Sequence, residues 1–269
     1  MKKIMAVVLA LVMGLATAGC STSKNNAAGA NATDSDLEYV QNKGKLVIGI
    51  TEFAPMDYKD ENGDWIGFDA DMAKAFAESI GVEAEFVLID WDNKTFELES
   101  KTIDCVWNGM TLTDDVKNAM DCSNAYCNNA QIVIVPMDKA DKYQTVESLS
   151  DLNFAVEASS AGKEQAEALG LKYTEVTAQS DAIMEVAAGT SDAAIIDSLM
   201  AAAMVGEGTS YENLTYTVGL NTEEYGVGFR KGSDLVEKLN EFFVKSYEDG
   251  SMIECAEEYK VQASLIEQK

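Results

Sequence analysis

The sequence has no histidine, one arginine and only two prolines among its 269 residues. Histidine is the commonest general base and the commonest metal ligand in proteins, so its absence disfavours most hydrolytic enzymes and metal sites. We therefore expect no catalytic residues, no metal and no cofactor. The two prolines and a hydrophobic content of 47% indicate a globular body, and the length suits one or two domains.

Positive charge is also scarce, because 20 lysines and arginines stand against 46 acidic residues and the formal net charge is -26. Binding to nucleic acid needs a basic face that neutralises phosphates, and this composition does not offer one. We expect no nucleic-acid partner. The acid excess is typical of a solvated surface, and it also favours cationic ligands near any cleft.

The first residues have the pattern of a secretory signal. Two lysines are followed by an apolar run over 4–18, which is short for a membrane span, and then by a Gly-Cys pair. This resembles a bacterial lipoprotein signal peptide over 1–20, with lipidation of Cys20, although a plain secretory signal is the alternative. A segment over 21–36, rich in Ser, Asn and Ala, is predicted to be a flexible tether. We expect an extracytoplasmic body anchored to the cell membrane by Cys20.

Four further cysteines lie in the body of the chain. Disulfides form outside the cytoplasm, and Cys122 and Cys127 are close enough in sequence to pair. Cys105 and Cys255 fall in apolar patterns and are expected to be small core residues. The sequence leaves the pairing of Cys122 with Cys127 open.

Short apolar runs alternate with helical patterns along the body, which predicts α/β lobes with mostly parallel sheets. We predict one lobe from 37–135 plus 222–269 and a second from 136–221, with chain crossings near 133–138 and 219–228. The predicted strands are 45–51, 83–90, 103–109, 130–135, 171–177, 191–197, 214–220 and 223–232, with helices at 67–81, 93–102, from Thr113, at 180–190, 198–206 and within 233–260. A further strand and helix are expected within 148–170.

Five stretches in fixed order carry a family resemblance over residues 38–262. They are TEFAPMDY, NGDWIGFDADMAKAFAESIGV, DCVWNGMTLT, SDAAIIDSLMAA and EYGVGFRKGSDL. Together they resemble the extracellular solute-binding proteins of family 3, which serve importers of polar amino acids. The resemblance implies a periplasmic-binding-protein-like type II fold, with two α/β lobes, a two-strand hinge and an interlobe ligand cleft. It implies capture of an amino acid for an ABC permease in the membrane, and we expect a monomer.

The resemblance also implies ligand-binding positions in the first lobe. Phe53 and Trp91 would provide aromatic walls, with core packing and a surface lid as the respective alternatives. Asn108, Gly109 and Thr111 match strand-end positions that meet the ligand's carboxylate and ammonium in relatives. A plain turn is the alternative for these three.

In the second lobe, Asp197 ends a predicted strand where relatives hold the ligand's ammonium. A carboxylate buried by lobe closure demands a cationic partner, so Asp197 is the strongest candidate. Ser159 and Ser160 would present hydroxyls and amides to a carboxylate at a helix start.

Val116 departs from the family pattern, because relatives carry an arginine there that grips the ligand carboxylate. The only arginine, Arg230, lies in what we interpret as a surface strand end. Three explanations stay open for how the site works without this arginine. Backbone amides at helix starts could hold the carboxylate, Lys117 could hold it as a point charge, or the ligand could have no carboxylate at this place. We expect a neutral polar or cationic amino acid. An amine lacking the carboxylate, a dehydratase-like enzyme of the same fold and a sensing role are the alternatives.

Overall fold

The computed structural model describes residues 35–269. The predicted signal peptide, the lipidation site Cys20 and nearly all of the predicted tether lie outside the described residues. Helix α1 (Asp36–Lys43) begins the described body, and the hydroxyl of its N-cap Ser35 accepts a hydrogen bond from the Glu38 amide at 2.9 Å. The folded body therefore begins slightly before the predicted boundary at residue 37.

The first sheet has the strand order β4-β1-β5-β13-β6, and β7 also pairs with β13. Its strands are β1 (Lys45–Ile50), β4 (Glu83–Leu88), β5 (Cys105–Thr111), β6 (Asp121–Cys122), β7 (Cys127–Asn129) and β13 (Glu223–Phe229). A short hairpin of β2 (Tyr58–Lys59) and β3 (Trp65–Ile66) leads into the first long helix. The helices of this part are α2 (Phe68–Ser79), α3 (Lys94–Glu99), α4 (Asp114–Ala119), α8 (Leu235–Glu248) and α9 (Ser251–Glu258), with 3-10 turns η1 (Trp91–Asn93) and η4 (Gln262–Ser264).

Both faces of this sheet are covered, which explains why β1 is almost continuously apolar. Ile48 belongs to the core that includes Phe76 of α2 and Phe243 of α8. The alternate residue Val47 packs on the other side with Leu98 of α3 and Val116 of α4. The period-two alternation of side chains along the strand thus separates two apolar layers.

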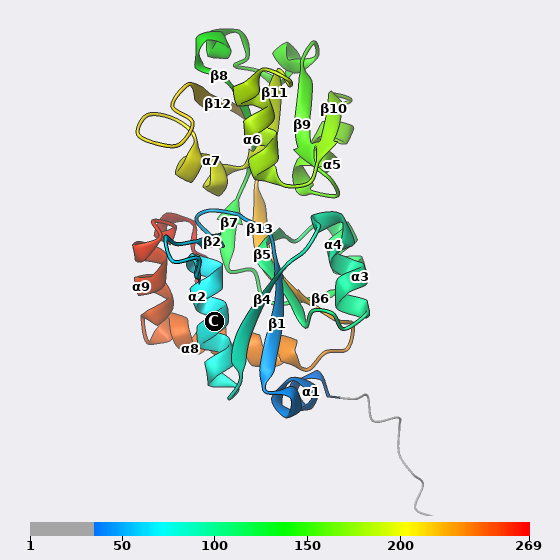
Figure 1. Cartoon of the computed structure of the whole chain (residues 1–269), viewed down its shortest axis with the longest axis vertical. Helices are drawn as coiled ribbons and strands as arrows, with labels where there is room; N and C mark the ends of the chain where they lie inside the picture. The colour runs from blue at the N-terminus through cyan, green and yellow to red at the C-terminus, as the bar shows by residue number, and fades with distance from the viewer. Residues whose placement is uncertain (1–34) are drawn as a thin grey trace, which may run out of the picture. The chain divides into compact units, whose positions relative to one another are not determined.

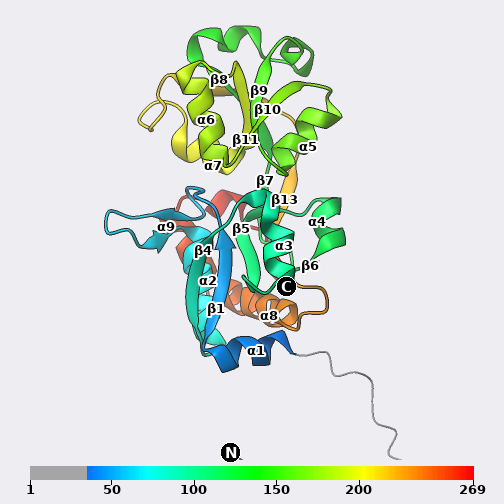
Figure 2. The ribbon, with the colours of Figure 1, turned by 45° about the vertical axis from the view of Figure 1, so that its right-hand side comes forward.

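The second sheet has the order β10-β9-β11-β8-β12. Its strands are β8 (Gln131–Pro136), β9 (Asn153–Glu157), β10 (Lys172–Val176), β11 (Ala193–Asp197) and β12 (Leu214–Gly219). Its helices are α5 (Ala161–Ala168), α6 (Gln179–Ala188) and α7 (Ser198–Met204), with 3-10 turns η2 (Met137–Lys142) and η3 (Val146–Leu149). In both views of the ribbon, β7 and β13 lie at the junction between the two sheets (Figure 1 and Figure 2).

The predicted strands and helices are confirmed, and the sheets are mostly parallel, as predicted, except for one antiparallel strand in each. β1, β4 and β5 are parallel, as are β9, β10 and β11, whereas β13 and β8 run antiparallel to their neighbours. The reason is that β8 and β13 are the strands by which the chain enters a sheet from the other one. The first crossing falls between Asn129 and Gln131, earlier than the predicted 133–138, because the apolar run of β8 pairs with β11 and β12.

Arg230 is structural and does not lie free at a surface strand end. Its Nε lies 3.0 Å from the Asp36 carboxylate and its Nη2 lies 3.4 Å from Asp104. These ion pairs join α1 to the loop before β5. The four cysteines of the described part are free thiols, with Cys105 and Cys127 buried. Within residues 35–269, no helix has both the length and the apolarity needed to cross a bilayer.

Candidate ligand-binding site

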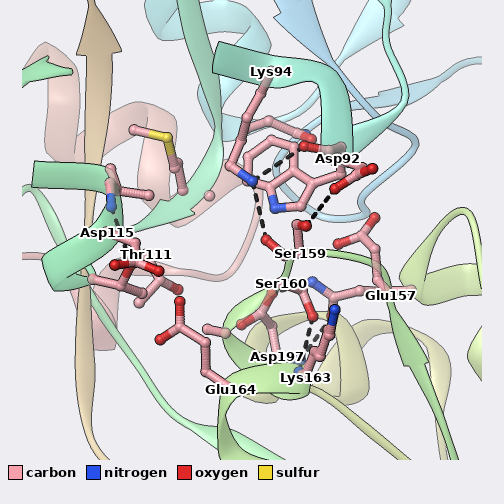
Figure 3. Close-up of a pocket in the computed structure, with 18 of the residues that line it drawn as sticks. Asp92, Lys94, Thr111, Asp115, Glu157, Ser159, Ser160, Lys163, Glu164 and Asp197 are labelled. Carbon is pink, nitrogen blue, oxygen red and sulfur yellow. Dashed lines mark hydrogen bonds between the residues drawn. The ribbon is translucent and has the colours of Figure 1, made fainter. Parts of the chain in front are cut away.

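A cavity of about 350 Å³ opens between residues of the two sheets, within the size range of small-molecule sites (Figure 3). Eight of the nine predicted ligand-binding residues line it: Phe53, Trp91, Asn108, Gly109, Thr111, Ser159, Ser160 and Asp197. The exception is Lys117, which does not line this cavity. Folding therefore brings side chains that are up to 144 residues apart in sequence together around one cavity.

These residues converge because each follows or ends a strand at the edge that faces the cavity. Phe53 follows β1, and the segment from Asn108 to Thr111 ends β5. On the other side, Ser159 follows β9 and Asp197 ends β11. Within each sheet these strands are parallel, so their carboxyl ends meet at one edge, where α/β folds bind ligands.

The β5 wall is held rigidly by the protein itself. The side-chain Oδ1 of Asn108 accepts from the Thr51 amide at 2.7 Å, and its Nδ2 donates to Asp57 at 2.7 Å. Gly109 has a φ of 53°, and a Cβ at this position would lie 2.5 Å from Cε1 of the Phe53 ring. Its amide donates to Asp69 at 2.6 Å. Glycine is thus required for the close approach of Phe53 to the strand end.

Asp197 has the strongest electrostatic signature in the cavity. The side chain is only 3% exposed, and its Oδ1 accepts from Asn129 and Gln131, each at 2.5 Å. Gln179 donates to its other oxygen. Burial, and then the negative charge of Glu223, raise the pKa of Asp197 to about 8. Among residues 35–269, no lysine or arginine lies within 4.0 Å of this carboxylate.

Glu157 is a second buried acid in the cavity wall that the sequence analysis missed. It ends β9 and is 3% exposed, and its Oε1 has no hydrogen-bond partner. Burial, and then the charge of Asp197, raise the pKa of Glu157 to about 8. Its signal in the sequence was the same as that of Asp197, namely an acid at the last position of a buried strand.

Lys94 is the second residue that the sequence analysis missed. It is the first residue of α3 and is 7% exposed. Its Nζ donates to the carbonyl of Trp91 at 3.1 Å and to the carbonyl of Ser159 at 3.0 Å, and it lies 4.8 Å from the centroid of the Trp91 ring. The lysine therefore connects the first sheet's residues to the loop after β9.

The two predicted serines are already engaged by neighbouring groups. Ser159 adopts a φ of 54°, and its hydroxyl donates to the Asp92 carboxylate. The Ser160 hydroxyl accepts from the Lys163 amide at 3.2 Å and caps α5. The hydroxyls thus shape the loop, and Ser160 and Ala161 at the start of α5 line the cavity.

The helix after the β5 wall explains why Lys117 is absent from the cavity. Thr113 caps α4 as predicted, since its hydroxyl accepts from the Val116 amide at 3.3 Å. Val116 is buried and lines the cavity, whereas Lys117 lies about 100° further around the helix and is exposed. The helix therefore presents an apolar side chain to the cavity.

The charges on the cavity wall are mostly negative. Its acidic residues are Asp92, Asp115, Glu157, Glu164, Glu167 and Asp197, and its basic residues are Lys94 and Lys163. Lys163 is paired with Glu175 at 3.0 Å. The wall therefore suits a ligand with at least one positive charge.

Comparison with known proteins places this geometry in a family. Residues 46–262 match the family described as bacterial extracellular solute-binding proteins, family 3. The chain is 29% identical to the arginine-binding extracellular protein ArtP of Bacillus subtilis, over 89% of this chain and 93% of that protein. It is 30% identical to a probable histidine-binding protein of Neisseria gonorrhoeae, covering 87% and 90% of the two chains.

Solved structures agree with the fold. The P235GK mutant of ArgBP from T. maritima superposes with a TM-score of 0.77 at 28% identity, covering 84% of this chain and 99% of that chain. A Streptococcus pneumoniae ABC uptake transporter substrate-binding protein with bound histidine gives a TM-score of 0.76 at 29% identity, covering 84% and 96%. These findings confirm the predicted family and the two-lobed fold class. The chain belongs to the bacterial extracellular solute-binding proteins of family 3.

Proposed function

We propose that this protein captures one amino acid between its two lobes, outside the cytoplasm, and delivers it to an ABC permease in the membrane. The observation that carries the proposal is Asp197, a buried carboxylate in a small cavity with three amide donors and, among residues 35–269, no lysine or arginine within 4.0 Å. An amino acid's ammonium supplies the missing charge. The names of relatives that bind arginine, histidine and cystine support an amino acid as the ligand class.

The other predicted residues take supporting roles in this proposal. Phe53 and Trp91 flank the ligand with aromatic surface. Thr111, whose hydroxyl donates to Glu223 at 2.8 Å, helps to position the acids around Asp197. The free amides at the start of α5 receive the ligand's carboxylate, as helix N-termini do.

The lobes are proposed to move about the two chain crossings. One lobe would comprise 37–130 with 222–269, and the other 131–221. The crossings are joined by a hydrogen bond from the Gln131 amide to Asn221 at 2.6 Å. Rotation about two short crossings is a common hinge for domain closure around a ligand, and closure is the signal that a permease would detect.

A thermal-shift screen of the twenty amino acids and the common polyamines tests the proposal. Because a ligand stabilises the folded state by mass action, the true ligand raises the Tm with concentration. Replacement Asp197→Asn should abolish this shift, and Asp151→Asn, an exposed acid of the same lobe outside the cavity, should leave it unchanged. A polyamine as the sole stabilising compound would instead support the alternative of an amine without a carboxylate.

A dehydratase-like enzyme is a second candidate, because buried acids with raised pKa are typical of general acids. Asp197 and Glu157 both have a pKa of about 8. One structural relative is the ancestral amino acid-binding protein AncCDT-1, a precursor of cyclohexadienyl dehydratase, with a TM-score of 0.76. Incubation with prephenate-like acids tests this candidate, and we expect no turnover.

We also propose that Cys20 is lipidated and anchors the body to the membrane. The sequence pattern around Cys20 is the support for this step. Replacement Cys20→Ala should release the protein from the membrane fraction of producing cells. Continued membrane association of the variant would refute the anchor.

A further inference from the structure

Lys94 places a positive charge in the cavity without a direct ion pair to any residue in 35–269. Its ammonium is bonded to two carbonyl oxygens, from Trp91 and Ser159, and among residues 35–269 no carboxylate lies within 4.0 Å of it. An ammonium has three N–H donors, so one remains for another acceptor. A buried charge without a counter-ion is costly, and a negative or strongly polar ligand atom would reduce that cost.

Glu157, in the same cavity wall, has an acceptor oxygen that lacks a hydrogen-bond donor. Its carboxyl is 3% exposed, and Oε1 is buried without a donor. Buried acceptors in folded proteins are almost always hydrogen-bonded, so an unpartnered one at a cavity wall indicates a place for a ligand's donor.

Lys94 and Glu157 both line the cavity, but they do not form an ion pair with each other. The close-up shows Lys94 and Glu157 on either side of the Ser159 loop, with both side chains extending toward the cavity (Figure 3). The charge of each residue affects the pKa of the other. Among residues 35–269 the two side chains form no ion pair within 4.0 Å, so each keeps bonding capacity for a ligand group in the cavity that both line.

We propose that Lys94 and Glu157 form a distal subsite that binds a ligand end carrying both an acceptor and N–H donors. This proposal rests on the proposed function, in which Asp197 holds the α-ammonium. A side-chain amide, a neutral imidazole or a second amino-acid head group meets both needs. A guanidinium or alkylammonium end can donate hydrogen bonds to Glu157, but the positive charge of Lys94 repels it. The protein therefore selects neutral polar or doubly zwitterionic amino acids over arginine and lysine.

Calorimetric titration of the wild-type protein with L-glutamine, L-histidine, L-cystine, L-arginine and L-lysine tests the selectivity. We expect at least one of the first three to bind ten or more times tighter than arginine and lysine. Replacement Lys94→Met keeps the stem length and removes the charge. It should weaken the preferred ligand at least tenfold and tighten arginine or lysine, because the repelling charge next to Glu157 is gone.

Lys45→Met is the matched control. It removes a lysine that is paired with Glu85 at 2.5 Å and does not line the cavity. The ranking of the five ligands should stay as in the wild type. Unchanged circular dichroism and Tm establish that each variant is folded.

Glu157→Gln separates the two kinds of ligand end. A glutamine still accepts from an amide or imidazole N–H, so a neutral ligand end should lose less than threefold in affinity. An ammonium end loses its charged partner and should bind at least tenfold more weakly.

The failures of the two proposals are distinguishable. If arginine or lysine binds tightest to the wild type, or if Lys94→Met leaves the ranking unchanged, the distal subsite is refuted while amino acid capture stands. If no amino acid or cystine binds the folded wild-type protein, the proposed function is refuted as well.

Discussion

At the scale of single residues, the site combines buried acids with few cations. Asp197 is surrounded by amide donors that come from three segments of the chain, namely Asn129, Gln131 and Gln179. These donors orient the carboxyl, but burial and the nearby Glu223 keep its pKa at about 8. The empty site therefore holds a proton at neutral pH that a bound cation would displace.

This protonation predicts that binding depends on pH. Below pH 8 the Asp197 carboxyl is mostly protonated, so a cationic group must expel a proton to bind. Affinity should rise about tenfold per pH unit from pH 6 toward 8 and level off above it, because each unit of pKa corresponds to about 1.4 kcal/mol. Calorimetry in buffers of different ionisation enthalpy measures both the affinity and the protons released. A flat profile with no proton release would contradict the assignment of Asp197.

The residue scale also shows the limit of inference from sequence. Asp197 was predicted because it ends a strand at the position where the resembled family holds the ligand's ammonium. Lys94 and Glu157 are 63 residues apart, and their importance comes from the loop at Ser159, where the two sheets' residues meet. Periodicity reveals which face of an element is buried, but it does not reveal which elements from different lobes approach each other.

At the scale of elements, the end of β5 is shaped by Gly109. A side chain there would strike the Phe53 ring and also adopt an unfavourable positive φ. We predict that Gly109→Ala destabilises the protein by about 1–3 kcal/mol and weakens ligand binding. Denaturant unfolding and calorimetry provide the measurements.

Gly63→Ala is the control for this prediction. Gly63 also has a positive φ of 87°, but nothing lies within 4 Å of the added Cβ. It should show only the backbone cost, with ligand affinity unchanged. Equal effects of the two variants would mean that contact with Phe53 is unimportant.

The single arginine joins three elements far from the cavity. Arg230 follows β13 and pairs with Asp36 of α1 and with Asp104 before β5, and Asp104 is fully buried. We predict that Arg230→Met costs about 3–5 kcal/mol, because buried Asp36 loses its close partner and buried Asp104 keeps only Lys43, at 2.5 Å. Ligand affinity of the folded fraction should not change.

Lys101→Met is the comparison for Arg230. Lys101 also approaches Asp36, at 4.0 Å, but its side chain is largely exposed. An exposed ion pair contributes about 0–1 kcal/mol, so the loss should be small. If the two variants lost similar stability, burial of the Arg230 ion pairs would not explain the effect of Arg230→Met.

At the scale of the whole molecule, the sequence predicted the order of elements and the two-lobed class. It did not predict which strand of each sheet is antiparallel, because strand direction depends on where the chain changes lobe. β8 and β13 have the same apolar patterns as their parallel neighbours, yet both run antiparallel to them. A strand's sequence encodes its burial on two faces, whereas its direction is set by the path of the connections.

Stability should also depend on pH across the whole body. Burial raises the pKa of Asp69 to about 7 and those of Glu157 and Asp197 to about 8, above the values of unfolded chains. The folded state therefore binds more protons between about pH 4 and 8, and the free energy of unfolding falls as pH rises through that window. The Tm of the ligand-free protein should be higher at pH 5.5 than at pH 8.5.

The variant Asp197→Asn tests the source of this trend. It removes one of the raised carboxyls, so the fall in Tm between pH 5.5 and 8.5 should become smaller. An equally steep fall in the variant would assign the trend to the general repulsion of the acidic surface.

The hydrogen bonds of Ser159 have a consequence for ligand selectivity. The carbonyl of Ser159 accepts a hydrogen bond from Lys94 and its hydroxyl donates to Asp92, so residues from opposite sides of the cavity are in direct contact. A ligand that enters the cavity competes with these hydrogen bonds. Its net binding free energy is the free energy of its own contacts minus the cost of the hydrogen bonds that it breaks. Ligand selectivity therefore depends on the strength of these internal hydrogen bonds as well as on the contacts that the ligand makes.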